Sequence, residues 1–117
     1  MNEDFITYEL AKKLKEKGFD YPCIGHYVNN KLYIAHYQNA FHSDNDESVD
    51  APTISQVLKW LRNTYNLHVE TYPCVLGMWK FLVTNITTLE ERALCDKYTS
   101  SEQSALAGIE YVFDNLI

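Results

Sequence analysis

The segment LHVETYPCVLGMWKFLV, residues 67–83, decides the fold class because side chains of two kinds alternate along both of its halves. One set is Leu67, Val69 and Thr71 in the first half, with Trp79, Phe81 and Val83 in the second. Successive side chains of a strand point to opposite faces, so a period of two is typical of a strand with one buried face. The segment therefore predicts two β-strands.

A second pair of strands is predicted upstream of this segment. The stretches CIGHYV and KLYIAHY flank Asn29 and Asn30, and asparagine tolerates the left-handed backbone that tight hairpin turns require. With a two-residue loop, residues whose numbers add to 59 are paired. This register places His26, Tyr33 and Tyr37 on one face of the hairpin. Residues 38–50 are polar and acidic, and we expect them to form a surface loop.

Three helices are predicted from their capping residues and apolar stripes. The first begins after Thr7 and ends at Gly18, the second begins at the pair Thr53 and Gln56, and the third begins at Ser100 and Gln103. Residues 93–98 favour a strand, with a short helix as the alternative. We therefore expect a single α+β domain over residues 1–117, with an antiparallel sheet of four to five strands and three helices on one face. The expected order is α-β-β-α-β-β-(β)-α.

The tripeptide YPC occurs twice, at residues 21–23 and 72–74. Each copy follows a predicted helix and precedes an aromatic strand, so each proline is expected at the start of a strand, where it is tolerated. The repeat indicates an internal duplication of a helix and β-hairpin unit.

Composition and charge restrict the classes of function. The hydrophobic share of 46% is typical of a folded globular chain. The net charge of −6 disfavours binding to phosphate backbones, which requires clustered Lys and Arg. The acidic start lacks a signal peptide's apolar core, and no apolar run approaches the length of a membrane span. We expect a cytoplasmic protein that has reduced thiols and no membrane partner.

Three stretches, TYELAKKLKEKGFDYPC, DAPTISQVLKWLRNTYN and SSEQSALAGIEYVFDNLI, together resemble small uncharacterised proteins of phages and mobile elements in gut anaerobic bacteria. The resemblance covers the helices and their caps, and it includes no catalytic motif. It implies a mobile-element context, with no activity and no functional residue to transfer.

Cysteines and histidines could bind zinc at Cys23, His26 and Cys74, because CxxH spacing lets two ligands reach one ion. A structural site needs four ligands, however, and Cys74 has only His68 nearby in the sequence. The hairpin register also places Cys23 and His26 on opposite faces. Buried thiols are favoured, and no metal or cofactor is expected.

The acidic loop places Asp44, Asp46, Ser48 and Asp50 at alternating positions, as in a calcium loop. Val49 stands where such a loop needs glycine, and Ser55 stands where it needs glutamate. A solvated loop is favoured over a calcium site.

Nucleophilic catalysis would need a cysteine or serine beside a base. Cys23 and His36 are the one such pair that the register predicts. They fall on the side expected to face the core, where burial raises the pKa of a thiol and lowers its nucleophilicity.

The open face of the expected sheet is the strongest candidate for a binding site. An aromatic face of mixed charge is typical either of a contact surface or of an ordinary solvated sheet. We expect a non-enzymatic module that binds a protein partner or self-associates. The alternatives are single-stranded nucleic-acid binding by the same face and an enzyme near Cys23 and His36. The candidate residues are His26, Tyr33, Tyr37, His68, Glu70, Tyr72, Met78, Lys80 and Leu82.

Overall fold

The computed structural model describes residues 5–34 and 48–117, and of the side chains within these ranges it leaves out those of 48, 75 and 93–97. The described chain is α+β, with three α-helices and two three-stranded antiparallel sheets. It divides into two compact units, Met1–Gln56 and Val57–Ile117, which are described separately. The expectation of one domain stays a prediction.

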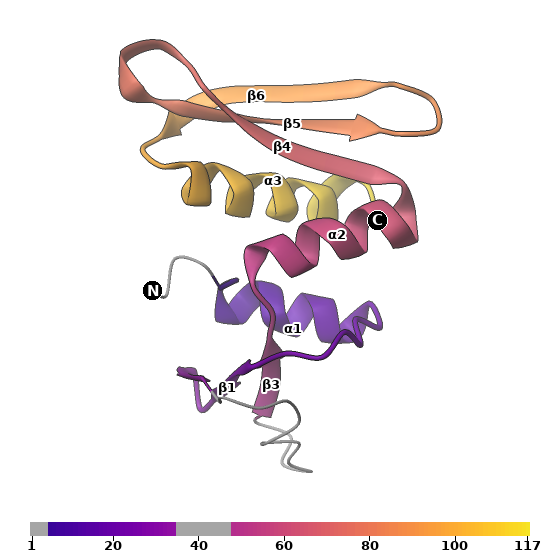
Figure 1. Cartoon of the computed structure of the whole chain (residues 1–117), viewed down its shortest axis with the longest axis vertical. Coiled ribbons are helices and arrows are strands. Elements are labelled where there is room, and N and C mark those ends of the chain that lie inside the picture. The colour runs from indigo at the N-terminus through magenta and orange to yellow at the C-terminus, as the bar shows by residue number, and fades with distance from the viewer. Residues whose placement is uncertain (1–4, 35–47) are drawn as a thin grey trace. The chain divides into compact units, whose positions relative to one another are not determined.

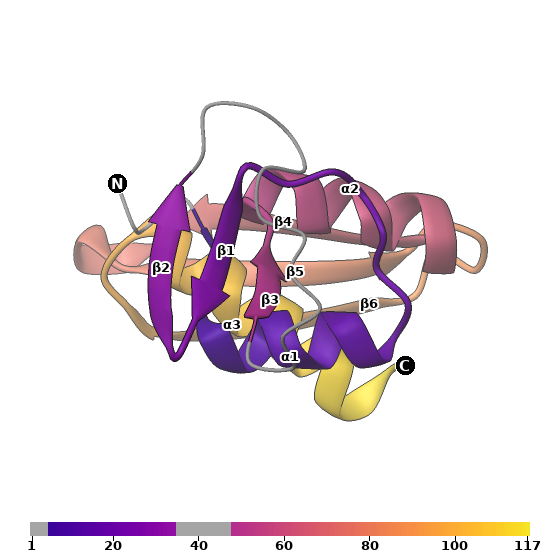
Figure 2. The same cartoon turned by 90° about the horizontal axis from the view of Figure 1, so that it is seen from below.

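The first unit contains helix α1 (Tyr8–Glu16) and strands β1 (Gly25–Val28), β2 (Lys31–Ile34) and β3 (Ser48–Ala51). Figure 2 shows β1 between β2 and β3. His26 pairs with Tyr33, so the predicted hairpin register is confirmed. Asn29 and Asn30 have φ angles of 53° and 65°, as a turn that is left-handed at both positions requires.

The core of the first unit forms where α1 packs against β3. The N-cap of α1 is the predicted Thr7, whose hydroxyl accepts a hydrogen bond from the backbone N–H of Leu10. Glycine is required at position 25, because a Cβ there would lie 2.7 Å from the Phe5 ring and 2.8 Å from the Ala51 carbonyl oxygen. The Tyr27 hydroxyl donates to the Ile6 carbonyl at 2.8 Å, which fixes β1 to the segment before α1.

Helix α2 (Ile54–Tyr65) begins at the predicted capping box. Thr53 N–H donates to the Gln56 side-chain oxygen at 2.9 Å, and Gln56 N–H donates to the Thr53 hydroxyl at 3.2 Å. The apolar pattern predicts a face of Ile54, Val57, Leu58, Leu61 and Tyr65. Of these, Ile54, Val57 and Leu61 are buried, whereas Leu58 and Tyr65 are half-buried. Trp60 is also buried and packs edge-on against the Tyr65 ring at 5.4 Å.

The second unit contains strands β4 (Leu67–Pro73), β5 (Trp79–Asn85) and β6 (Glu91–Tyr98) in the order β4-β5-β6, followed by α3 (Ser101–Asn115). The strand prediction for residues 93–98 is therefore confirmed. In Figure 1, α3 runs along one face of this sheet, where it packs on β4 and β5. Ser100 caps α3 as predicted, but Gln103 accepts from Thr99 N–H instead of completing the box with Ser100.

The prediction of one sheet with all helices on one face is wrong. Residues 48–50 were expected in a loop, yet they belong to β3, which occupies the second edge of β1. The alternation of β3 spans only four residues next to an acidic run, so its strand signal is weak. The two strand orders also differ, with the first strand central in one sheet and the second central in the other. These different strand orders do not match the two equal units that an internal duplication predicts. Pro73 also ends a strand instead of starting one.

Candidate functional site

One face of the β4-β5-β6 sheet is turned away from α3, and we call it the outer face. Along β4 and β5, the residues of the outer face alternate with buried residues that point to the opposite face, namely Leu67, Val69, Phe81 and Val83. The predicted strand alternation is therefore confirmed here. The members of the outer face, assigned by strand alternation and by register, are His68, Glu70, Tyr72, Lys80, Leu82, Thr84 and Glu91.

Charged and aromatic groups of the outer face contact one another along β4 and across to β5. The Lys80 ammonium lies 5.6 Å from the centre of the Tyr72 ring, a cation–π contact between residues that are paired in the register. His68 Nε2 lies 3.6 Å from Glu70 Oε1 on the same strand. Contacts of this kind at exposed sites contribute at most about 1 kcal/mol each. These contacts orient the side chains, which stay accessible to a binding partner.

The pKa of Tyr72 is raised by partial desolvation, then by a hydrogen bond to the Glu70 carboxylate and by the negative charges of Glu70 and Glu91. The phenol therefore stays protonated at neutral pH, where it can act as a hydrogen-bond donor.

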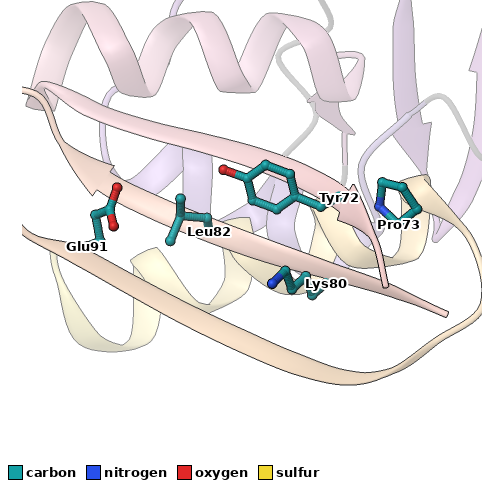
Figure 3. A pocket seen from close by; sticks show the side chains of 5 residues that line it. All are labelled: Tyr72, Pro73, Lys80, Leu82 and Glu91. Atoms are coloured by element: carbon teal, nitrogen blue, oxygen red, sulfur yellow. The ribbon is translucent and has the colours of Figure 1, made fainter. Parts of the chain in front are cut away.

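The outer face has a hollow that runs across β5 from the end of β4 to the start of β6. The hollow has a volume of about 460 Å³, and Figure 3 shows the side chains that line it, on one face of the sheet. Small-molecule sites are usually concave and bury most of the ligand. This hollow is open and shallow, with a lysine and a glutamate in its lining, which suits a protruding side chain of a macromolecule better. The lining residues are Tyr72, Pro73, Lys80, Leu82 and Glu91.

The structure brings five of the nine predicted site residues to the outer face: His68, Glu70, Tyr72, Lys80 and Leu82. Met78 lies in the β4–β5 connection, where its carbonyl accepts from Cys74 N–H at 2.8 Å. Tyr37 lies outside the described residues. Glu91 was missed because the start of β6 was ambiguous in the sequence, although its strand alternation places it on this face.

The placement of His26 and Tyr33 on this same face is wrong, because both belong to the first sheet. Their rings stack with centres 5.9 Å apart, Tyr33 is exposed, and His26 is only 5% exposed. Burial lowers the pKa of His26, while the charge of Asp50 opposes that shift.

The environment of Cys23 makes its thiol a poor nucleophile. Burial raises the pKa of Cys23 to about 12, with a further contribution from Asp50, and the thiol donates to the Tyr21 carbonyl at 3.2 Å. This agrees with the expected loss of nucleophilicity. His36 lies outside the described residues, as do Asp44 and Asp46 of the calcium-like pattern.

No group of three or more His, Cys, Asp or Glu residues within 5–34 and 48–117 is arranged to hold a metal ion. In the same part of the chain, no helix has the length and apolar character needed to cross a bilayer.

Comparison with known proteins finds no match to a family model, a curated protein or a solved structure. The resemblance to proteins of mobile elements therefore stays a prediction.

Proposed function

We propose that this protein is a non-enzymatic module that docks another protein on its outer face, as an accessory protein of a mobile element. The observation that carries the proposal is the hollow itself. Leu82 lies among Tyr72, Lys80 and Glu91, so an apolar centre is flanked by an aromatic ring and by charges of both signs. Protein interfaces combine an apolar centre with a polar rim and are enriched in tyrosine.

The arrangement of the second unit supports this proposal over a catalytic role. An antiparallel sheet covered on one side commonly leaves its other side to solvent, and α3 covers the inner face here. Catalysis at Cys23 would require a thiolate, and a pKa of about 12 keeps the thiol protonated at neutral pH. The outer face holds side chains suited to contact and lacks an activated nucleophile among its described residues.

Site-specific photo-cross-linking tests the proposal. A photoreactive phenylalanine analogue at Leu82 is expected to give protein adducts in cells that express the chain, detected as a mass shift on denaturing gels. The matched control carries the same analogue at Lys59, which is exposed on α2. Equal adduct yields at both positions, or none at position 82, would overturn the proposal. A Tyr72→Ala change in the position-82 chain should lower the adduct yield.

A further inference from the structure

Leu82 lies midway between two charges of opposite sign in the hollow. Lys80, Leu82 and Thr84 occupy alternate positions of β5, so their side chains share the outer face. Glu91 of β6 pairs with Thr84. At about 3.4 Å per residue, Leu82 is about 7 Å along the strand direction from Lys80 and about 7 Å from Glu91. Figure 3 shows Leu82 between these two charged side chains. The outer face thus presents a cation, an apolar group and an anion in a line along β5.

The two charges at the ends of this line are open to a partner. Glu70 is engaged with neighbours on its own strand, His68 and Tyr72. Where the structure describes side chains, Lys80 contacts the neutral ring of Tyr72, and neither Lys80 nor Glu91 forms an ion pair. A partner that places opposite charges over both ends would therefore gain two complementary contacts.

The size of the outer face suits a short segment better than a second folded domain. Three strands of about seven residues cover roughly 24 Å by 14 Å, or about 340 Å². A standard interface between folded proteins buries about 800 Å² on each partner. An extended segment of about five to seven residues is about 17–24 Å long, so it spans this face and needs no further area.

We infer that the occupant of the outer face is an extended segment of another protein in which an acidic, an apolar and a basic residue hold alternate positions; this inference rests on the proposed function. Alternate side chains of an extended chain point to the same side about 7 Å apart, which equals the spacing of the three groups along β5. The acidic residue lies over Lys80, the apolar residue packs on Leu82, and the basic residue lies over Glu91. Because an extended chain fits along β5 in both directions, the acidic residue is either the first or the third of the three.

Synthetic peptides test the spacing. The probe is a peptide of about nine residues with Glu, Leu and Lys at alternate central positions and Ser or Gly elsewhere, titrated into isotope-labelled protein and followed by amide NMR shifts. It should bind with a dissociation constant below about 1 mM and shift the amides of Lys80 and Leu82. A peptide of the same composition with Glu, Leu and Lys consecutive should bind at least about fivefold more weakly, because adjacent side chains point to opposite sides. Equal binding of the two peptides would overturn the inference.

Reversal of one charge tests the pairing. At about 150 mM salt, the wild type should prefer the Glu–Leu–Lys peptide over a Lys–Leu–Lys peptide by about fivefold, and Lys80→Glu should reverse that preference. Lys59→Glu is the matched control, because Lys59 is exposed on α2 and each change takes the net charge from −6 to −8 by removing one cation and adding one anion. This control should keep the wild-type preference. A preference that reverses in both variants follows net charge alone and would sink the pairing.

Cross-linking at position 82 separates this inference from the proposed function. The partner fragment attached to the analogue should contain the alternating acidic, apolar and basic residues. Adducts on fragments without this pattern, or the absence of peptide binding at about 1 mM, would refute the linear segment and leave docking on the outer face standing. If position 82 gives no adducts, the proposed function falls and the inference falls with it.

Discussion

The Cys23 thiol offers a chemical test at the scale of one residue. Its pKa is raised from 9.0 to about 12, so at pH 8 the thiolate fraction falls about a thousandfold. Alkylation of Cys23 by iodoacetamide should therefore be slower by about that factor in the folded protein than in guanidinium-unfolded protein. Peptide mass mapping separates Cys23 from Cys74 and Cys95. Comparable rates in the two states would contradict the half-buried, protonated thiol and favour a reactive site.

The lowered pKa of His26 predicts how the free energy of unfolding changes with pH. Burial lowers its pKa in the folded state below the unfolded value of 6.5. A depressed pKa means that the folded state binds the proton less tightly, so the contribution of neutral His26 is present above 6.5 and is lost as the pH falls through the folded value. The charged and titratable neighbours on the paired strands are Asp50 and Tyr33.

Urea unfolding at about pH 7.5 and about pH 5.5 measures this effect. The wild type should lose more unfolding free energy between the two values than His26→Gln, because the carboxylates titrate alike in both proteins. The same pH dependence in both proteins would contradict the expected shift.

Sequence reasoning succeeded at residues whose role is set by near neighbours. Thr7, Thr53 and Ser100 cap their helices through backbone N–H groups three residues away, so the sequence alone identified them. His26 was placed on an open face because alternation tells which side of a strand a residue occupies. Alternation does not tell what covers that side, so the burial of His26 was missed.

At the scale of elements, Gly108 sets how closely α3 approaches its sheet. A Cβ at position 108 would lie 2.7 Å from Val69 Cγ1 and 3.1 Å from Phe81 Cγ. Gly108→Ala should therefore destabilise the protein by about 1–3 kcal/mol through overpacking, although the same change in a free helix stabilises it by about 1 kcal/mol. Chemical denaturation measures the change in unfolding free energy.

The exposed position Glu110 provides the matched control on α3, and Glu110→Ala should stay within about 0.5 kcal/mol of the wild type. A stabilised Gly108→Ala protein would show that α3 and the sheet are more loosely packed than the structure has them. Gly108 was not predicted as a contact, because its role depends on side chains from two distant strands.

At the scale of the whole molecule, the sequence predicted strands better than it predicted their partners. The alternation in β4 and β5 and the asparagine turn between β1 and β2 are local signals, and both pairings were correct. Two sheets arise because β1 and β5 each pair on both edges with strands of their own unit. That choice depends on pairing energies between separated segments, which periodicity does not encode. The residues expected to share one face do so where they belong to a single sheet, and His26 and Tyr33 are separated from them because those two belong to the other sheet.

The negative net charge of the chain predicts that it does not bind single-stranded nucleic acid. Stacking of one base on an aromatic ring contributes about 1–3 kcal/mol, and affinity further requires cations along the backbone. The chain carries a net charge of −6, and the outer face opposes Lys80 with Glu70 and Glu91. A labelled thymidine oligomer of about 20 nucleotides should therefore show no saturable change in fluorescence anisotropy, even at low salt.

The variant Glu70→Lys with Glu91→Lys supplies the missing cations and should give weak binding that disappears as salt is added. Saturable binding by the wild type that is lost in Tyr72→Ala would instead make the outer face a nucleic-acid surface, because the binding would then depend on the aromatic residue of that face.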